Sequence, residues 1–349
     1  MTTYDLAHHG DAEVADGLLD YAVNVRLTGP PRWLRDRLAA ALDTLGAYPD
    51  GRAAASAVAR RYRRPVLEVL LTAGAAEAFV LLARALTPRR AVCVHPSFTE
   101  PEAALRAAGL RVERVTLPPP YRLNPALVPD DADLVILGNP TNPTGVLHPP
   151  EVVLSLARPG RILLVDEAFA DTVPGEPASV AAASGVPGLV VLRSLTKTWG
   201  LAGLRVGYLL AAPEIVRRLA AAQPLWPVSA LALTALQACM TPAAVAEAAA
   251  AAEALAGHRR HLLAGLRRLP QVAVAAESST SFLLLQVPDG SAVRKRLRAG
   301  GVAVRRGDTF PGLGGDHLRV AVRAPERSDL LVAALAAAVR AGQPTGQRI

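Results

Sequence analysis

From residue 67 onward the chain alternates short apolar runs with helix-forming stretches, and this alternation restricts its fold more than any other feature. The runs 91–94, 134–137 and 189–192 are too short for helices and predict buried strands. Strands that alternate with helices are typical of an α/β domain with a largely parallel sheet. Because ligands of such sheets bind at the carboxyl ends of the strands, we expect functional residues directly after the apolar runs.

On either side of this alternation the pattern changes. The first thirty residues carry few periodic apolar positions, so we expect 1–30 to form an arm, which packs with the small domain. A large domain is expected over 31–228, starting with a helix at 33–45. The remainder, 229–349, is expected to hold a linking helix from about 230 to 256 and a small α+β domain. That domain should contain strands at 271–275, 281–287, 302–304 and 317–322 and helices at 291–299 and 325–340.

Length and charge limit the class of protein. The 349 residues are enough for about two domains with substantial cores. The net charge of +8 does not favour nucleic-acid binding, because the arginines are scattered through helices. No run of about 18 residues is uncharged and apolar throughout, so we expect no membrane span. Two cysteines, Cys93 and Cys239, cannot form a disulfide framework, and we expect a cytoplasmic protein.

The segment 194–208 carries the strongest chemical signal. It places Lys197 in a turn between two apolar runs, with Ser194 and Thr196 beside it and Arg205 shortly after. A lysine at a strand end can form a Schiff base with an aldehyde cofactor, and hydroxyls with a guanidinium can bind a phosphate. The alternative is a solvated loop lysine, which is the commoner state of a lone lysine.

Other polar residues also follow apolar runs. After 67–71, Gly74, Ala75 and Ala76 start a helix whose free backbone amides can hold a phosphate, although small residues at a helix start are common. After 134–137, two Asn-Pro turns stiffen the loop that carries Asn142.

The next run, 161–165, ends at Asp166. A carboxylate at the end of a buried strand needs a proton or a cation to offset its desolvation, unless it caps a helix.

These motifs occur in an order that resembles the fold-type I pyridoxal-5′-phosphate enzymes, in particular the branch of histidinol-phosphate aminotransferases and L-threonine-O-3-phosphate decarboxylases. The resemblance implies that Lys197 carries pyridoxal 5′-phosphate and that Phe98 stacks on its ring. It also implies a homodimer, in which Tyr48 of the Tyr-Pro-Asp turn reaches the neighbouring subunit's cofactor. The remaining implied cofactor contacts are the phosphate ligands Gly74, Ala75, Ala76, Ser194, Thr196 and Arg205, the phenolic-oxygen donor Asn142 and the ring-nitrogen partner Asp166.

The same resemblance implies a small anionic amino-acid phosphate as substrate. It assigns His8 and Arg305 to the phosphate, and Asn24 and Arg319 to the carboxylate, with Asn142 also near the substrate. No metal site, membrane partner or nucleic-acid partner is expected.

Three positions bear on the reaction. Phe169 resembles the decarboxylases, whereas Asp11 and Ser229 each stand where their motif usually has asparagine. We expect first a threonine-phosphate decarboxylase of cobalamin biosynthesis, a lyase. The alternative is a transferase of the histidinol-phosphate aminotransferase type. A cofactor-binding regulator without turnover is less favoured, because such proteins usually append a DNA-binding domain.

Overall fold

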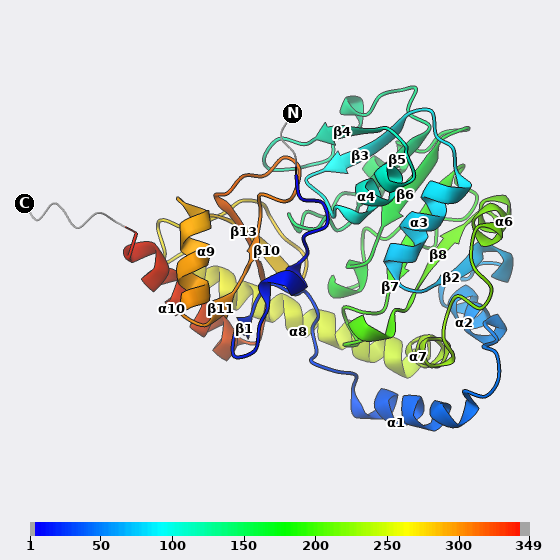
Figure 1. Cartoon of the computed structure of the whole chain (residues 1–349), viewed down its shortest axis with the longest axis horizontal. Coiled ribbons are helices and arrows are strands. Elements are labelled where there is room, and N and C mark those ends of the chain that lie inside the picture. The colour runs from blue at the N-terminus through cyan, green and yellow to red at the C-terminus, as the bar shows by residue number, and fades with distance from the viewer. Residues whose placement is uncertain (1–3, 343–349) are drawn as a thin grey trace, which may run out of the picture.

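A computed structural model describes residues 4–342 (Figure 1). Its central feature is a seven-stranded sheet in the order β2-β8-β7-β6-β5-β3-β4. All neighbouring pairs are parallel except those of β8, which runs antiparallel to both β2 and β7. The strands are β2 (Val69–Thr72), β3 (Ala91–His95), β4 (Val112–Thr116), β5 (Leu134–Gly138), β6 (Ile162–Asp166), β7 (Leu189–Ser194) and β8 (Gly207–Ala211).

Helices cover both faces of this sheet, because its inner strands are apolar on both sides. On β6, Leu163 and Val165 join one core, whereas Leu164 joins the other. The first core includes α1 (Arg32–Ala41), α2 (Arg52–Tyr62), α5 (Pro150–Leu154) and α7 (Ala230–Cys239). The second includes α3 (Ala75–Ala85), α4 (Glu100–Ala107) and α6 (Pro213–Ala221).

A smaller unit is built on an antiparallel sheet in the order β12-β13-β10-β9, with a core of its own. It lies at the left of Figure 1, and its helix α10 packs on α8 (Pro242–Leu266). Its elements are β9 (Ala273–Val274), β10 (Phe282–Gln286), α9 (Gly290–Ala299), β11 (Val302–Ala303), β12 (Arg305–Arg306), β13 (His317–Ala321) and α10 (Pro325–Arg340).

The amino-terminal residues cross between the two units (Figure 1). Their strand β1 (Leu19–Asp20) pairs in parallel with β11, so that Leu19 lies opposite Val302. Further along, Arg26 donates its backbone N–H to the carbonyl of Lys197 across 2.9 Å. The arm therefore contacts both the small sheet and the lysine turn.

The linking helix differs from the sequence expectation of one helix from about 230 to 256. The structure has two helices, α7 and α8 (Pro242–Leu266), bent by 75°. The bend occurs where Thr241 caps α8 by accepting from the N–H of Ala244, and Pro242 removes a backbone donor. Within residues 4–342, no single helix is long and apolar enough to cross a membrane; α7 and α8 pass that test only as a bent pair.

Candidate active site

A cavity of ≈ 450 Å³ opens at the carboxyl ends of the parallel strands, on the side where the arm and the small unit meet the large sheet. β3, β5, β6 and β7 each run into a segment that lines it, as expected for a sheet of this kind. The structure thus brings together most of the site residues expected from sequence. Those that line the cavity are Asn24, Ala75, Ala76, Phe98, Asn142, Asp166, Ser194, Thr196, Lys197, Arg205, Arg305 and Arg319.

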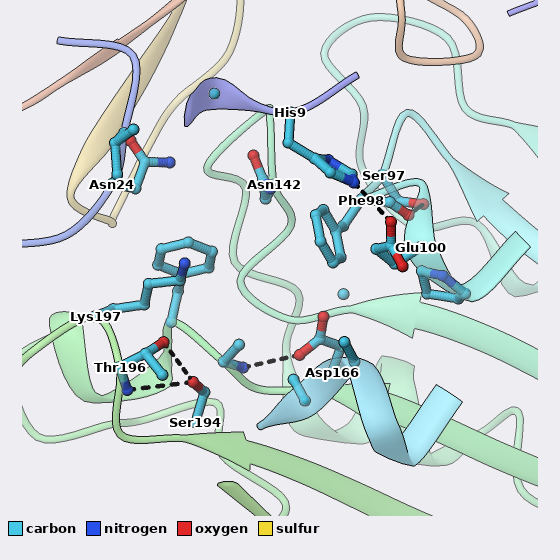
Figure 2. Close-up of a pocket in the computed structure, with 18 of the residues that line it drawn as sticks. His9, Asn24, Ser97, Phe98, Glu100, Asn142, Asp166, Ser194, Thr196 and Lys197 are labelled. Carbon is cyan, nitrogen blue, oxygen red and sulfur yellow. Dashed lines mark hydrogen bonds and ion pairs between the residues drawn. The ribbon is translucent and has the colours of Figure 1, made fainter. Parts of the chain in front are cut away.

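Lys197 lies on the turn that follows β7, and Figure 2 shows it beside Asn24, across the cavity from His9 and Glu100. Burial lowers the pKa of the Lys197 amine to about 8, and the positive charges of Arg319 and Arg205 add to this effect. A lysine with a lowered pKa is more often in the neutral form that attacks carbonyl groups.

A cradle for an anion forms where β2 turns into α3. Gly74, at φ +78°, precedes the first helical residue, and a Cβ at this position would lie 2.5 Å from Nη2 of Arg205. Only glycine lets the backbone come so close to that guanidinium. The hydroxyls of Ser194 and Thr196 hydrogen-bond to each other at 2.8 Å and line the same cavity (Figure 2). Gly74 itself shapes the cradle without lining the cavity, which Ala75 and Ala76 do.

Asp166 ends β6 and accepts one hydrogen bond from the backbone N–H of Ala168 across 3.0 Å (Figure 2). Burial raises the pKa of its carboxyl group to about 6, and the charge of Lys197 only partly opposes this. No arginine of residues 4–342 forms a salt bridge with Asp166, so the carboxylate still needs a cation or proton.

Two arginines of the small sheet enter the cavity. Arg319 donates from Nη1 to Oδ1 of Asn142 at 2.6 Å, and Arg305 donates from Nη2 to the hydroxyl of Thr309 at 2.6 Å. Neither forms an ion pair with a carboxylate of the described chain. Burial lowers the pKa of Arg319 to about 9 and that of Arg305 to about 10. Such lowering is expected of buried cations that have no nearby anion to stabilise their charge.

Besides Gly74, two expected site residues, His8 and Tyr48, do not line the cavity, and Ser229, a departure from the motif, caps a helix. His8 turns away from the cavity and pairs with Glu13 at 3.0 Å, although its carbonyl accepts from Arg305. Tyr48 is 76% exposed and stacks on Trp226, with ring centroids 4.1 Å apart. Ser229 caps α7 by accepting from the N–H of Ala232, which asparagine could also do.

Sequence reasoning missed His9 and Glu100, whose side chains pair across 2.6 Å at the cavity wall (Figure 2). The ring of His9 also lies 5.4 Å from that of Phe98. Of the tandem His8-His9, the second residue lines the cavity and the first does not. Glu100 follows β3 by five residues, so the rule that functional residues follow strands could have found it.

Comparison with known proteins agrees with this geometry. Residues 18–335 match the family model described as aminotransferase class I and II. The chain belongs to the aminotransferase class I and II family. Among its relatives, a histidinol-phosphate aminotransferase of Mycobacterium tuberculosis is 53% identical over 94% of this chain and 90% of that protein. A threonine-phosphate decarboxylase of Salmonella typhimurium is 31% identical over 96% of this chain and 97% of that protein.

Solved structures of this family share the fold. The histidinol-phosphate aminotransferase of Clostridium acetobutylicum superimposes with a TM-score of 0.85 at 24% identity, over 93% of this chain and 100% of that one. The L-threonine-O-3-phosphate decarboxylase of Porphyromonas gingivalis gives a TM-score of 0.82 at 26% identity, over 91% of this chain and 98% of that one. The expected α/β fold of a fold-type I enzyme is therefore confirmed.

Pyridoxal 5′-phosphate is the cofactor of this family, and the residues present fit it. The cradle of Gly74 and Arg205 suits its phosphate, because a helix start and a guanidinium both favour an anion. Asp166 would offset its own desolvation by holding a proton on the ring nitrogen. Lys197 has the lowered pKa that attachment of an aldehyde needs.

Proposed function

We propose that this enzyme is an aminotransferase of the histidinol-phosphate type, which acts on a phosphorylated amine. The observation that carries the proposal is the meeting of Lys197 with Arg305 and Arg319, two buried arginines without a carboxylate partner, in one cavity. An aminotransferase takes two substrates in turn, and these arginines can hold the phosphate of one and the carboxylate of the other. The relative at 53% identity supports this choice.

The roles of the side chains follow from their positions. When bound, the cofactor ring withdraws electrons from the substrate α-carbon. Asp166 holds the proton on the ring nitrogen, and Lys197 moves the α-hydrogen. Asn142 has its Oδ1 occupied by Arg319, so its Nδ2 would remain free to donate a hydrogen bond to the bound cofactor. His9, rather than His8, is the histidine that can contact the substrate.

A threonine-phosphate decarboxylase is the second candidate. Phe169 favours it, because its ring lies 5.7 Å from Nζ of Lys197 and offers no hydroxyl to the cofactor, unlike a tyrosine. The sequence expectation placed this activity first, whereas the identity of the relatives supports the aminotransferase more strongly. The two reactions differ in which bond of the α-carbon the cavity holds perpendicular to the ring.

One pair of assays separates the candidates. The cofactor-loaded protein is incubated with histidinol phosphate and a 2-oxo acid, and formation of the new amino acid is followed. In parallel it is incubated with L-threonine O-3-phosphate alone, and carbon dioxide release is followed. Amino-acid formation that Arg319→Ala abolishes supports the aminotransferase. Carbon dioxide release without amino-acid formation would replace it with the decarboxylase.

We also propose that the protein acts as a homodimer with shared sites. Tyr48, Trp226 and Leu225 are 76%, 52% and 79% exposed, which is unusual for large apolar side chains that lie together. If a second copy covers these side chains, Tyr48 of one subunit comes near the cradle of Gly74 and Arg205 in the other subunit. Analytical ultracentrifugation of the wild type and of Trp226→Glu measures the oligomeric state. The wild type should sediment as a dimer and the variant as a monomer.

A further inference from the structure

A small chamber lies next to Lys197, and Asn24 and Lys197 line both this chamber and the main cavity. Its volume is ≈ 10 Å³, about the room that one water molecule needs. Five parts of the fold meet there: the arm, the loop after β6, the lysine turn, α8 and the start of β10. The lining residues are Asn24, Arg26, Asp171, Thr172, Lys197, Thr198, Ala251, Ala252, Leu255 and Ser281.

Four buried polar atoms without a partner belong to residues of this chamber. They are Nδ2 and Oδ1 of Asn24, Oδ1 of Asp171 and Oγ of Ser281, none of which has a hydrogen-bond partner in the described chain. Asn24 is 5% exposed and Ser281 is 8% exposed. Only two other side-chain atoms within residues 4–342 share this state, on Thr72 and Arg319. Four of the six unsatisfied atoms therefore belong to residues that line this chamber, although Asn24 also lines the main cavity.

Buried polar groups are nearly always paired, with protein or with an ordered water. Asn24 offers a donor and an acceptor, Asp171 offers an acceptor, and the Ser281 hydroxyl can do either, while Lys197 forms part of the wall. A water molecule can serve both kinds, whereas a metal cation would be repelled by Lys197 and Arg26. The size and the mixed polarity thus select water.

We propose that this chamber holds one water molecule that hydrogen-bonds to Asp171 and Lys197 and carries protons between them. In the forward step, the O–H bond of the Asp171 carboxylic acid breaks and its proton passes to the water. The water gives a different proton to the lone pair of the neutral Lys197 amine, and Asp171 is left as a carboxylate. The reverse step returns the lysine to its neutral form. The inference rests on the proposed function in so far as Lys197 moves the α-hydrogen.

The surroundings of Asp171 let it exchange protons near neutral pH. Burial raises the pKa of its carboxyl group to about 6, and Glu176 adds to this, whereas Arg193 on β7 and the hydroxyl of Thr198 oppose it. Arg26 of the arm and Cys239 of α7 also face Asp171. Asp171 therefore changes charge within the range in which enzymes of this kind work.

Asp171 also connects the chamber to the outside. It lines a second cavity of ≈ 490 Å³ on the α8 side of β7, whose wall includes the exposed Gly175 and Ala249. Protons can therefore enter from the surface through this second cavity. Such a path serves Lys197 while substrate and cofactor fill the main cavity and exclude water from it.

The path predicts that solvent deuterium is incorporated into the substrate. In D₂O, an α-hydrogen taken up by Lys197 is replaced by deuterium through Asp171, so recovered substrate gains deuterium. Asp171→Asn keeps the shape but cannot release or accept the proton. We expect the ratio of α-hydrogen exchange to turnover to fall at least about tenfold in Asp171→Asn, with KM for the amine unchanged. Ser281→Ala, which removes one contact of the water, should lower the ratio about threefold.

The control is Asp36→Asn, which makes the same chemical change on the exposed face of α1, where the Asp36 side chain is 69% exposed. Mass spectrometry of recovered substrate measures the ratio in each protein. The proposal is overturned if Asp171→Asn and Ser281→Ala both give the same ratio of exchange to turnover as the control.

A crystal structure of the wild type loaded with the amine form of the cofactor, which leaves the Lys197 amine free, gives a test that needs no turnover. A water molecule within hydrogen-bond distance of Asp171 and Lys197 is expected, and a dry chamber overturns the proposal. If the wild type exchanges no α-hydrogen of any amine while the water is present, the proposed function fails and the water site stands.

Discussion

Arg319 of the small sheet donates to the side-chain oxygen of Asn142, which follows β5 of the large sheet, across 2.6 Å. This bond joins the two units of the fold inside the active-site cavity. It also fixes the amide of Asn142, because an oxygen held by a guanidinium leaves the NH₂ group to face elsewhere. Under the proposed function, a substrate anion that binds Arg319 therefore contacts the same guanidinium that orients the Asn142 amide.

Asp166→Asn should reduce kcat by about 10²–10³-fold, because an amide cannot hold the proton on the ring nitrogen. The size of the side chain is unchanged, so the cofactor should still bind. Steady-state rates and cofactor absorbance, measured on the same sample, check both parts. A variant with a normal rate would show that Asp166 has another partner.

The lowered pKa of Lys197, about 8, predicts how the apo-enzyme takes up pyridoxal phosphate. The neutral amine reacts, so the attachment rate should rise about tenfold per pH unit below pH 8 and level off above it. Arg319 contributes to the lowering, and Arg319→Met should therefore move the midpoint to higher pH. Stopped-flow absorbance between pH 6 and 10 measures both curves. A midpoint that stays in place would contradict the electrostatic explanation.

Gly74→Ala should weaken cofactor binding about 10- to 100-fold, the loss expected when Arg205 is displaced from a charged hydrogen bond. The added Cβ would lie 2.5 Å from Nη2 of Arg205, and φ +78° is strained for alanine. Gly203→Ala is the matched control, since nothing lies within 4 Å of its Cβ. Equilibrium dialysis with pyridoxal phosphate compares the two variants, and equal affinities would argue against the cradle.

Glu102 of α4 is fully buried and accepts hydrogen bonds from His95, Arg106 and Arg114. Burial alone would raise the pKa of this carboxyl group, but the three partners outweigh it and lower the pKa to about 2. Glu102→Gln should reduce the free energy of unfolding by about 3–5 kcal/mol, because the neighbouring charges lose their partner.

The same carboxylate gives a pH dependence. Its pKa is lower in the folded than in the unfolded chain, so its contribution is complete above about pH 4.5 and is lost as pH falls toward 2. Urea unfolding at several pH values measures this, and the acid-induced loss should be smaller in Glu102→Gln. Parallel curves for the two proteins would show that other groups cause the loss.

Much of this fold could be predicted from sequence, because the strands are short apolar runs that end in polar residues. Through this rule Lys197, Asp166 and Asn142 were expected at strand ends, and all three line the cavity. The break between α7 and α8 was missed, because an alanine-rich stretch hides the effect of Thr241 and Pro242. The choice between His8 and His9 depends on the path of the arm across Phe98, which periodicity does not encode.

The proposed water chamber lay beyond sequence reasoning for a similar reason. Asn24, Asp171 and Ser281 are far apart in the chain and have no shared spacing. They meet only because the arm, the loop after β6 and the start of β10 converge behind the lysine turn. Buried polar atoms without hydrogen-bond partners indicate such a chamber, and only the three-dimensional structure identifies them.

The pairing of β1 with β11 has a consequence for biosynthesis. Leu19 is made well before its partner Val302. The segment around Leu19 must therefore wait until residue 302 has been made before it can pair. Contacts so distant in sequence form slowly, and domains that emerge first fold first. A nascent chain that lacks residue 302 can complete its large sheet while the pairing of β1 with β11 is still missing.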